Sequence, residues 1–241
     1  MSEPRITLIA EVSTNHGGNL DLAKRFIEAF AICTYVKFQW TRSHRPHPSD
    51  PQYAWFRQAE FSDAQFAELA QTCRDCGTQF LATVYHAEDV AAYQALGTTA
   101  IKIGSGEAED RALAKAVLPA GHPWHPVFVS EGIRMACGDY RRNRVAKLRC
   151  VSWYPTPLWY ARQVASQPYL LEAGWSDHVV GLEACHAALF AGATVIEKHV
   201  QLEGQARPPK AFEATVEEMQ RLRGFMNEHP ARFIGRWQHG G

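Results

Sequence analysis

Eight short apolar segments recur along the chain, and a helix-like segment follows each of them. The apolar segments are apolar throughout rather than at alternate positions, which is typical of strands that are buried on both faces of a parallel sheet. Strands joined by helical crossovers pair in parallel, and eight such units close a barrel. The sequence therefore predicts an α/β fold of the (β/α)₈ (TIM) barrel type.

The expected elements cover most of the chain, and we expect one domain over residues 1–241. The strands are expected at Ile6–Val12, Tyr35–Gln39, Gln79–Thr83, Ala100–Ile103, Pro126–Ser130, Leu148–Ser152, Gly174–His178 and Thr194–His199. The helices are expected at Leu20–Phe30, Asp63–Cys76, Ala87–Leu96, Asp110–Val117, Tyr140–Ala146, Pro157–Gln167, Leu182–Ala191 and Thr215–Asn227, of which the fifth is shortened. A long loop is expected over Thr41–Glu60. The alternative is an open doubly wound sheet, but no G-x-G-x-x-G follows the first strand, which weakens its dinucleotide-binding version.

The composition excludes several functional classes. Lys and Arg (25) balance Asp and Glu (25), so nothing indicates a nucleic-acid or membrane surface. No apolar run approaches the ~18 residues that a membrane span needs, and the N-terminus lacks a signal-peptide pattern, so we expect a cytoplasmic protein. Cys73 and Cys76 form a lone C-x-x-C pair without two further ligands for zinc, and we expect reduced, packed thiols.

Polar residues end almost every expected strand. In a barrel of this kind the active site lies where the strands end at their C-terminal face. The residues there are Glu11, Lys37, Gln39, Thr83, Lys102, Ser105, Glu107, Ser130, Glu131, Ser152, Tyr154, Ser176, Asp177, His178, Glu197, Lys198 and His199. Burial of so many polar groups is costly unless they satisfy one another or bind a ligand.

The period of a strand indicates which of these residues share a cavity. Residues i and i+2 point the same way, so Lys37 lies with Gln39, Ser176 with His178, and Glu197 with His199. Two lysines with several hydroxyls suit a phosphate and a carboxylate. Two histidines with a carboxylate suit a divalent metal that polarises a carbonyl. Together these groups suit a phosphorylated enolate that attacks an aldehyde.

Six motifs, in order along the chain, resemble the sialic acid synthase (N-acetylneuraminate synthase) family over residues 6–220. They are Ile9-Ala10-Glu11 with Asn15-His16-Gly17-Gly18, Val36-Lys37-Phe38-Gln39, Lys102-Ile103-Gly104-Ser105-Gly106-Glu107, Tyr154-Pro155-Thr156-Pro157, Ser176-Asp177-His178 and Glu197-Lys198-His199. The resemblance implies a TIM barrel that condenses phosphoenolpyruvate with an aminosugar aldehyde, with Mn²⁺ or Mg²⁺ as the cofactor. Phosphate leaves and a 3-deoxy-2-keto sugar acid forms, a reaction of carbohydrate biosynthesis.

The resemblance also implies roles for particular residues. His178 and His199 would hold the metal, and with Glu11, Lys37 and Lys102 they would form the catalytic set. Phosphoenolpyruvate would be bound by Lys37, Thr83, Lys102, Ser105, Ser130 and Ser176, whereas Glu11, Gln39, Glu107 and Tyr154 would face the acceptor.

Departures from the family pattern fall on the acceptor side. Thr-Gly after the fifth strand is Glu131-Gly132 here, a histidine before the sixth-strand cysteine is Arg149, and a late Asp-His is Pro208-Pro209. Family members usually carry a C-terminal antifreeze-like domain that touches the acceptor, and we expect none in this chain. The reaction type is therefore expected to survive while the acceptor differs.

Two other hypotheses remain open from the sequence. One is a metal-dependent aldolase or lyase that uses a pyruvate-type enolate without phosphate release. The other is a catalytically inactive barrel that serves as a binding subunit. A homodimer would need a surface other than the missing domain, and Trp153, Trp159 and Tyr160 are candidates for acceptor or partner contact as well as for buried packing.

Overall fold

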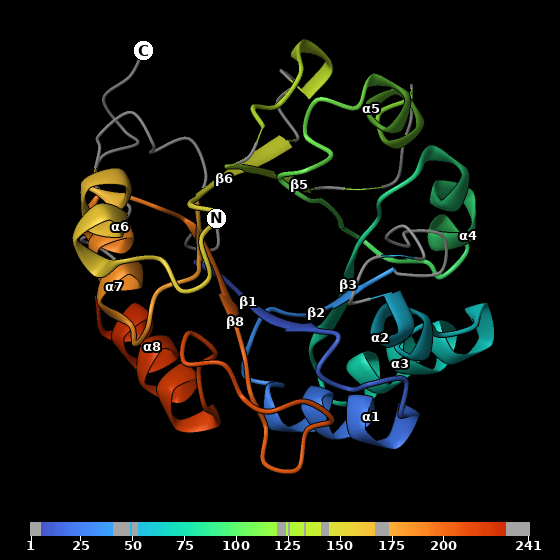
Figure 1. Ribbon diagram of the computed structural model, residues 1–241, viewed down its shortest axis with the longest axis horizontal. Helices are drawn as coiled ribbons and strands as arrows, with labels where there is room; N and C mark the ends of the chain where they lie inside the picture. Colours follow the sequence, from blue (N-terminus) through green and yellow to red (C-terminus); the bar gives the residue numbers. More distant parts are fainter. Residues whose placement is uncertain are drawn as a thin grey trace.

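The computed structural model describes residues 6–40, 49, 53–119, 124, 126–132, 134–140, 145–166 and 174–229. Its centre is a closed barrel of eight parallel strands in chain order, with β8 hydrogen-bonded to β1 (Figure 1). The strands are β1 (Thr7–Ser13), β2 (Tyr35–Gln39), β3 (Gln79–Thr83), β4 (Ile101–Ile103), β5 (Val127–Glu131), β6 (Val145–Cys150), β7 (Gly174–Asp177) and β8 (Val195–His199). The predicted (β/α)₈ fold is confirmed.

Helices surround the barrel as an outer ring (Figure 1). They are α1 (Leu20–Ala29), α2 (Tyr53–Gln58), α3 (Asp63–Asp75), η1 (Ala87–Asp89) with α4 (Val90–Gln94), α5 (Arg111–Val117), η2 (Gly138–Tyr140), α6 (Leu158–Ala165), α7 (Glu183–Phe190) and α8 (Val216–Glu228). Side-chain caps set several of the starts. Ser62 and Gln65 form a capping box on α3, and Thr215 and Glu218 form one on α8.

Three expected boundaries are wrong. The expected loop over Thr41–Glu60 contains α2, although most of the residues before this helix lie outside the described part of the chain. The expected helix Tyr140–Ala146 is wrong at its end, because Val145 already begins β6. The middle of this expected helix, residues 141–144, lies outside the described residues, and the described part of the crossover from β5 to β6 holds the 3₁₀ turn η2. The sixth strand also ends two residues earlier than expected, at Cys150.

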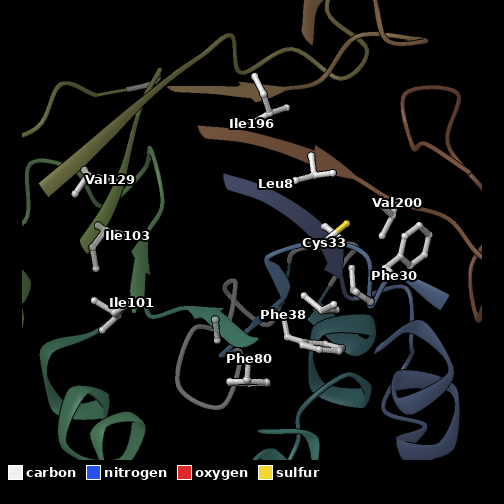
Figure 2. Packing of buried hydrophobic residues seen from close by; sticks show 14 of the residues in the cluster. Leu8, Phe30, Cys33, Phe38, Phe80, Ile101, Ile103, Val129, Ile196 and Val200 are labelled. Atoms are coloured by element: carbon white, nitrogen blue, oxygen red, sulfur yellow. The ribbon is translucent and has the colours of Figure 1, made fainter. Parts of the chain in front are cut away.

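The alternation of side chains along the strands divides the apolar core into two layers. One set packs outward against the helices and includes Leu8, Phe38 and Phe80, which are 5% exposed or less (Figure 2). The other set forms a smaller cluster that fills the barrel interior: Ile9, Tyr35, Leu81, Ala100, Phe128, Leu148 and Val195. Both faces of the strands are therefore apolar at this level, which is why the sequence shows continuous rather than alternating apolar runs.

The interior cluster closes the barrel below the site. Tyr35 and Phe128 meet edge to face, with ring centroids 5.6 Å apart. The next inward-pointing residue on each strand lies two positions towards the C-terminal end, where polar residues begin.

No helix in the described part of the chain has the length and apolar character that crossing a membrane requires.

Candidate active site

A polar layer lies directly above the apolar interior cluster. Seven of its eight members stand two residues after a member of that cluster, on the same side of the strand, and the eighth, Ser176, stands two residues after Gly174. The layer consists of Glu11, Lys37, Thr83, Lys102, Ser130, Cys150, Ser176 and Glu197, all of which are buried. The strand period alone therefore brings residues from all eight strands to one level of the barrel.

Lys37 lies between two carboxylates in this layer. Its Nζ is 3.1 Å from Glu11 Oε2 and 3.5 Å from Glu197 Oε1. It also donates a hydrogen bond to Thr83 Oγ1 at 3.0 Å. Burial by itself would lower the pKa of Lys37, but the two glutamates outweigh burial and the pKa is raised, so the ammonium stays charged.

Lys102 lies in the same layer on β4. Its Nζ donates to Ser130 Oγ at 2.7 Å and to the Ile103 carbonyl at 3.1 Å, and it lies 3.9 Å from Glu197 Oε2. Burial lowers the pKa of Lys102, with Glu197 opposing the effect. Lys102 is thus held by fewer compensating charges than Lys37.

Glu197 links the two lysines. Besides both ion pairs, its Oε1 accepts a hydrogen bond from Ser176 Oγ at 2.9 Å. Burial alone would raise the pKa of Glu197, but Lys102 and Lys37 outweigh it and the pKa is lowered. Its counterpart Glu11 has a raised pKa, because burial outweighs the attraction of Lys37.

Two carboxylate oxygens in this layer are buried without a hydrogen bond. They are Glu11 Oε2 and Glu197 Oε2, both within the part of the chain that the structure describes. Each lies near a lysine ammonium, but neither receives a well-directed donor. A buried oxygen without a donor is costly, and such groups are concentrated at sites that bind a ligand.

The two predicted metal ligands meet at the mouth. The rings of His178 and His199 are 5.3 Å apart between centroids. His178 Nδ1 lies 2.7 Å from the Val151 carbonyl, a contact that fixes the proton on Nδ1 and leaves Nε2 as the acceptor nitrogen. Burial lowers the pKa of both histidines, and for His199 the His178 ring and Lys37 lower it further. Both rings are therefore neutral near pH 7, the form that binds a metal.

No group of three or more His, Cys, Asp or Glu side chains within the described residues is arranged to hold a metal ion. Two imidazoles are the donors that the site offers for this purpose. Neutral imidazole suits several transition metals, so the pair fits a divalent ion whose remaining ligands come from outside the protein.

Aromatic rings flank the histidine pair. The Tyr154 ring is 4.2 Å from His178 and 6.1 Å from His199, and the Phe212 ring is 5.3 Å from His199. Lys210 Nζ lies 5.6 Å from the centre of the Phe212 ring. The position of Phe212 is fixed by its neighbour Glu213, which accepts a hydrogen bond from Asn15 Nδ2 at 3.1 Å.

The remaining predicted residues lie around this centre. Gln39 Nε2 is 3.5 Å from Glu11 Oε1, and Ser105 Oγ is 3.4 Å from Ser152 Oγ. Glu107 is half-buried beside Gly104, and burial raises its pKa. Tyr154 is 53% exposed and so belongs to the rim rather than to the interior.

Three residues of this centre are absent from the predicted site. The strand period groups Glu197 with His199, but the prediction gives Glu197 no role in the site. Cys150 follows the same period on β6 but is not among the predicted residues. Phe212 lies in the segment between β8 and α8, where no periodicity indicates its position.

Some residues that are close to the site residues in sequence point away from the site. Asp177 and Lys198 point away from the barrel interior and form a buried ion pair with each other. His16 stacks on Phe61 at 4.4 Å between ring centroids, accepts a hydrogen bond from the Gly18 amide, and has a pKa lowered to about 3 by burial. These residues stabilise the fold and do not line the site.

Comparison with known proteins agrees with this fold. Residues 28–229 match the NeuB family, and the chain belongs to that family. It is 28% identical to the N,N'-diacetyllegionaminic acid synthase of Campylobacter jejuni, over 84% of this chain and 69% of that protein. It is 29% identical to the N-acetylneuraminate-9-phosphate synthase of Drosophila melanogaster, over 82% of this chain and 60% of that protein.

A solved structure gives the same relationship. The N-acetylneuraminic acid (sialic acid) synthetase of Leptospira borgpetersenii superposes with a TM-score of 0.80 at 25% identity, over 98% of this chain and 86% of that chain. These three similar proteins are named as sugar acid synthases. The chain spans 60% of the length of the Drosophila relative and 69% of the Campylobacter one.

Proposed function

We propose that this protein condenses phosphoenolpyruvate with an aldehyde or aminosugar acceptor in a metal-dependent reaction, releasing phosphate and forming a 3-deoxy-2-keto acid. One observation carries the proposal: two buried lysines with hydroxyl partners share a barrel mouth with two neutral imidazoles. In this proposal the lysines bind the anionic donor, and the imidazoles bind the metal ion that acts as a Lewis acid. The family relationship agrees with a condensation of this type.

Lys37 and Lys102 bind the anionic donor in this proposal. Both ammonium groups lie in one buried layer, and each donates a hydrogen bond to a hydroxyl, Lys37 to Thr83 and Lys102 to Ser130. Charge-assisted hydrogen bonds are roughly twice as strong as neutral ones, and low polarity around them strengthens them further. Ser105, which follows β4, and Ser176, on β7, complete a cradle for a phosphate and a carboxylate in this proposal.

His178 and His199 hold the metal in this proposal. The Nδ1 contact of His178 with Val151 directs Nε2 towards a ligand, and depressed pKa values keep both rings neutral. When bound, Mn²⁺ or Mg²⁺ supplies Lewis-acid polarisation of the acceptor carbonyl.

The acceptor is oriented by residues on the side of the mouth nearest β1 and β2. Glu11 Oε2 lacks a hydrogen-bond donor, and Gln39 lies against the other oxygen of the same carboxylate. An acceptor hydroxyl would satisfy Glu11 Oε2 and so place its carbonyl above the lysines. Tyr154 and Phe212 exclude water from the opposite side.

Phosphate release from phosphoenolpyruvate tests the proposal. It is measured with Mn²⁺ across a panel of aldehydes and aminosugars, for the wild type, His199→Ala and His186→Ala. His186 lies on α7 against Phe225, outside the site, and serves as the matched control. We expect acceptor-dependent release that falls at least ~10²-fold in His199→Ala and is unchanged in His186→Ala.

Two results would count against the proposal. Condensation of pyruvate without phosphate release would indicate the aldolase alternative. Wild-type protein that binds neither Mn²⁺ nor phosphoenolpyruvate would indicate the inactive barrel.

A further inference from the structure

The segment between β8 and α8 places a lysine beside the histidine pair. Lys210 Nζ lies over the Phe212 ring, 5.6 Å from its centre, and that ring meets the His199 ring edge to face at 5.3 Å between centroids. The backbone fixes this arrangement, because the Ala214 amide donates to the His199 carbonyl at 2.8 Å. Lys210 therefore stands at the same barrel mouth as the proposed metal ligands.

Arg207, three residues earlier on the same segment, is a second cation. Its guanidinium carbon lies 4.9 Å from the centre of the Trp55 ring, and Trp55 Nε1 donates a hydrogen bond to Thr14 Oγ1 at 2.9 Å. The neighbouring Ala206 amide donates to the Asn15 carbonyl at 2.9 Å. Contacts with α2 and with the loop after β1 therefore hold the arginine in place.

The buried carboxylate of this segment, Glu213, is occupied by neutral donors. Its Oε1 accepts a hydrogen bond from Asn15 Nδ2 at 3.1 Å. Its Oε2 accepts from Gln205 Nε2 at 3.3 Å and from the backbone amide of Lys210 at 3.0 Å. Glu213 thus binds the backbone of Lys210 and forms no ion pair with its ammonium group.

Both cations lack a counter-charge. No carboxylate of the described residues lies within ion-pair distance of Lys210 or Arg207. Pro208 and Pro209 stand where the family pattern has Asp-His, so the residues just before the lysine supply no acid. Burial lowers the pKa of Lys210 and Arg207 lowers it further, with Glu213 opposing the effect. Two cations in this arrangement are suited to an anionic group of a ligand.

These cations lie at a different depth from the lysines of the inner polar layer. Lys37 and Lys102 are 2–3% exposed, whereas Lys210 is exposed. His199 follows the buried Glu197 of that layer by two residues on β8, and Phe212 and Lys210 lie beyond it. The mouth therefore has one group of cations below the histidine pair and another above it.

We propose that the acceptor carries an anionic group, a phosphate or a carboxylate, at the end remote from its aldehyde, and that Lys210 and Arg207 bind this group. The aldehyde then lies at the histidine pair, and phosphoenolpyruvate lies at the inner lysines. The assignment rests on the proposed condensation, but the binding of the anionic group does not require turnover.

Ligand-observed NMR with unreactive probes tests the binding. The probes are sorbitol, sorbitol 6-phosphate and gulonate, which are six-carbon chains without a carbonyl that end in a hydroxyl, a phosphate and a carboxylate. Each is titrated with phosphoenolpyruvate present, so that the inner lysines are occupied. The variants are Lys210→Met and Arg207→Met. Lys115→Met and Arg221→Met are matched controls, because these cations are exposed on α5 and α8.

We expect at least one of the two anionic probes to bind at least ~10-fold more tightly than sorbitol. Its dissociation constant should rise at least ~10-fold in Lys210→Met and in Arg207→Met and stay unchanged in the controls. The anionic probe that binds more tightly identifies the group as a phosphate or a carboxylate. Sorbitol that binds as tightly as both anionic probes, or a dissociation constant that is unchanged in Lys210→Met, would overturn the proposal.

A turnover experiment separates this proposal from the proposed function. Phosphate release is measured with N-acetylmannosamine, its 6-phosphate and its 6-carboxylate as acceptors. We expect kcat/KM to be at least ~10-fold higher for one of the charged acceptors, and Lys210→Met to remove this preference. Release with equal kcat/KM for all three acceptors would support the condensation and overturn the anionic acceptor. Anion binding that depends on Lys210, without phosphate release from any acceptor, would contradict the condensation and leave the anion-binding assignment intact.

Discussion

The inner and outer faces of the barrel wall both hold buried ion pairs, but the polar atoms of these pairs are not satisfied to the same degree. Glu197 faces inward and Lys198 faces outward on β8, one residue apart. Each forms buried ion pairs, Glu197 with Lys37 and Lys102, and Lys198 with Asp177. The five charged residues in these ion pairs are buried to nearly the same extent, with exposed fractions of 1–4%.

The difference lies in how completely the polar atoms are satisfied. On the outer face, Asp177 Oδ1 accepts a hydrogen bond from Trp175 Nε1 at 2.7 Å, and Asp177 Oδ2 pairs with Lys198. Lys198 also donates to the Val179 carbonyl. On the inner face, one oxygen of Glu197 and one of Glu11 lack a hydrogen bond. A closed network stabilises the fold, whereas an incomplete one retains capacity for a ligand.

The largest expected effect follows from breaking the outer pair. Lys198→Met leaves Asp177 as an uncompensated buried charge, and we expect the free energy of unfolding to fall by about 3–5 kcal/mol. Urea unfolding followed by circular dichroism measures the change. The double variant Lys198→Met with Asp177→Asn is the control, because it removes the stranded charge and should recover part of the loss. A loss below about 1 kcal/mol in the single variant would contradict the structural role.

The matching change on the inner face is expected to affect binding more than stability. Lys102→Met should weaken phosphoenolpyruvate binding by about 3 kcal/mol, roughly 10²-fold, because a buried charge contact to the anion is lost. Glu197 keeps Lys37 and Ser176 as partners, so the free energy of unfolding should change by only about 1 kcal/mol. Calorimetric titration and urea unfolding of the same protein measure the two quantities. A stability loss as large as that of Lys198→Met, with binding retained, would remove the distinction between the two faces.

A smaller effect on the free energy of unfolding is expected from His16, a buried histidine outside the site. The pKa of His16 is about 3 in the folded protein and 6.5 in the reference state, so the unfolded chain binds more protons between these values. His16 therefore contributes stability that is present above pH 6.5 and is lost as the pH falls towards 3. At pH 5 the loss amounts to about 2 kcal/mol.

His16→Gln removes this titration while an amide oxygen can still accept from Gly18. Both proteins are unfolded at pH 7 and at pH 5, and the loss of unfolding free energy between these pH values is compared. We expect this loss to be about 2 kcal/mol smaller in His16→Gln than in the wild type. Urea unfolding at both pH values measures the difference. Parallel losses in the two proteins would show that protonation of His16 does not account for the acid sensitivity.

Strand periodicity made much of the candidate site predictable. The grouping of Lys37 with Gln39 and of Glu197 with His199 needed only the two-residue repeat and the rule that such barrels place their sites at strand ends. The same repeat excludes Asp177 and Lys198, which alternate with the inward residues. Phe212 could not be predicted in this way, because its position depends on the contact between Asn15 and Glu213, 198 residues apart.

A groove of about 560 Å³ beside β6 also shows what could not be predicted from the sequence. The sequence shows that Glu131 and Arg149 depart from a family pattern, but not that they line one cavity with Trp153. It also misplaced the start of β6, because the β5–β6 crossover lacks the periodic apolar pattern by which a helix is recognised.

From the sequence alone one can derive the alternation of strands and helices, the two faces of each strand, and hence which polar residues enter the barrel. These depend on local periods of about 2 and 3.6 residues, which every segment carries within itself. Only the folded structure shows which carboxylate oxygens lack a donor, which aromatic rings lie beside the histidine pair, and which residues line the groove beside β6. These depend on contacts between strands and loops far apart in the chain, which form only when β8 pairs with β1 and closes the barrel.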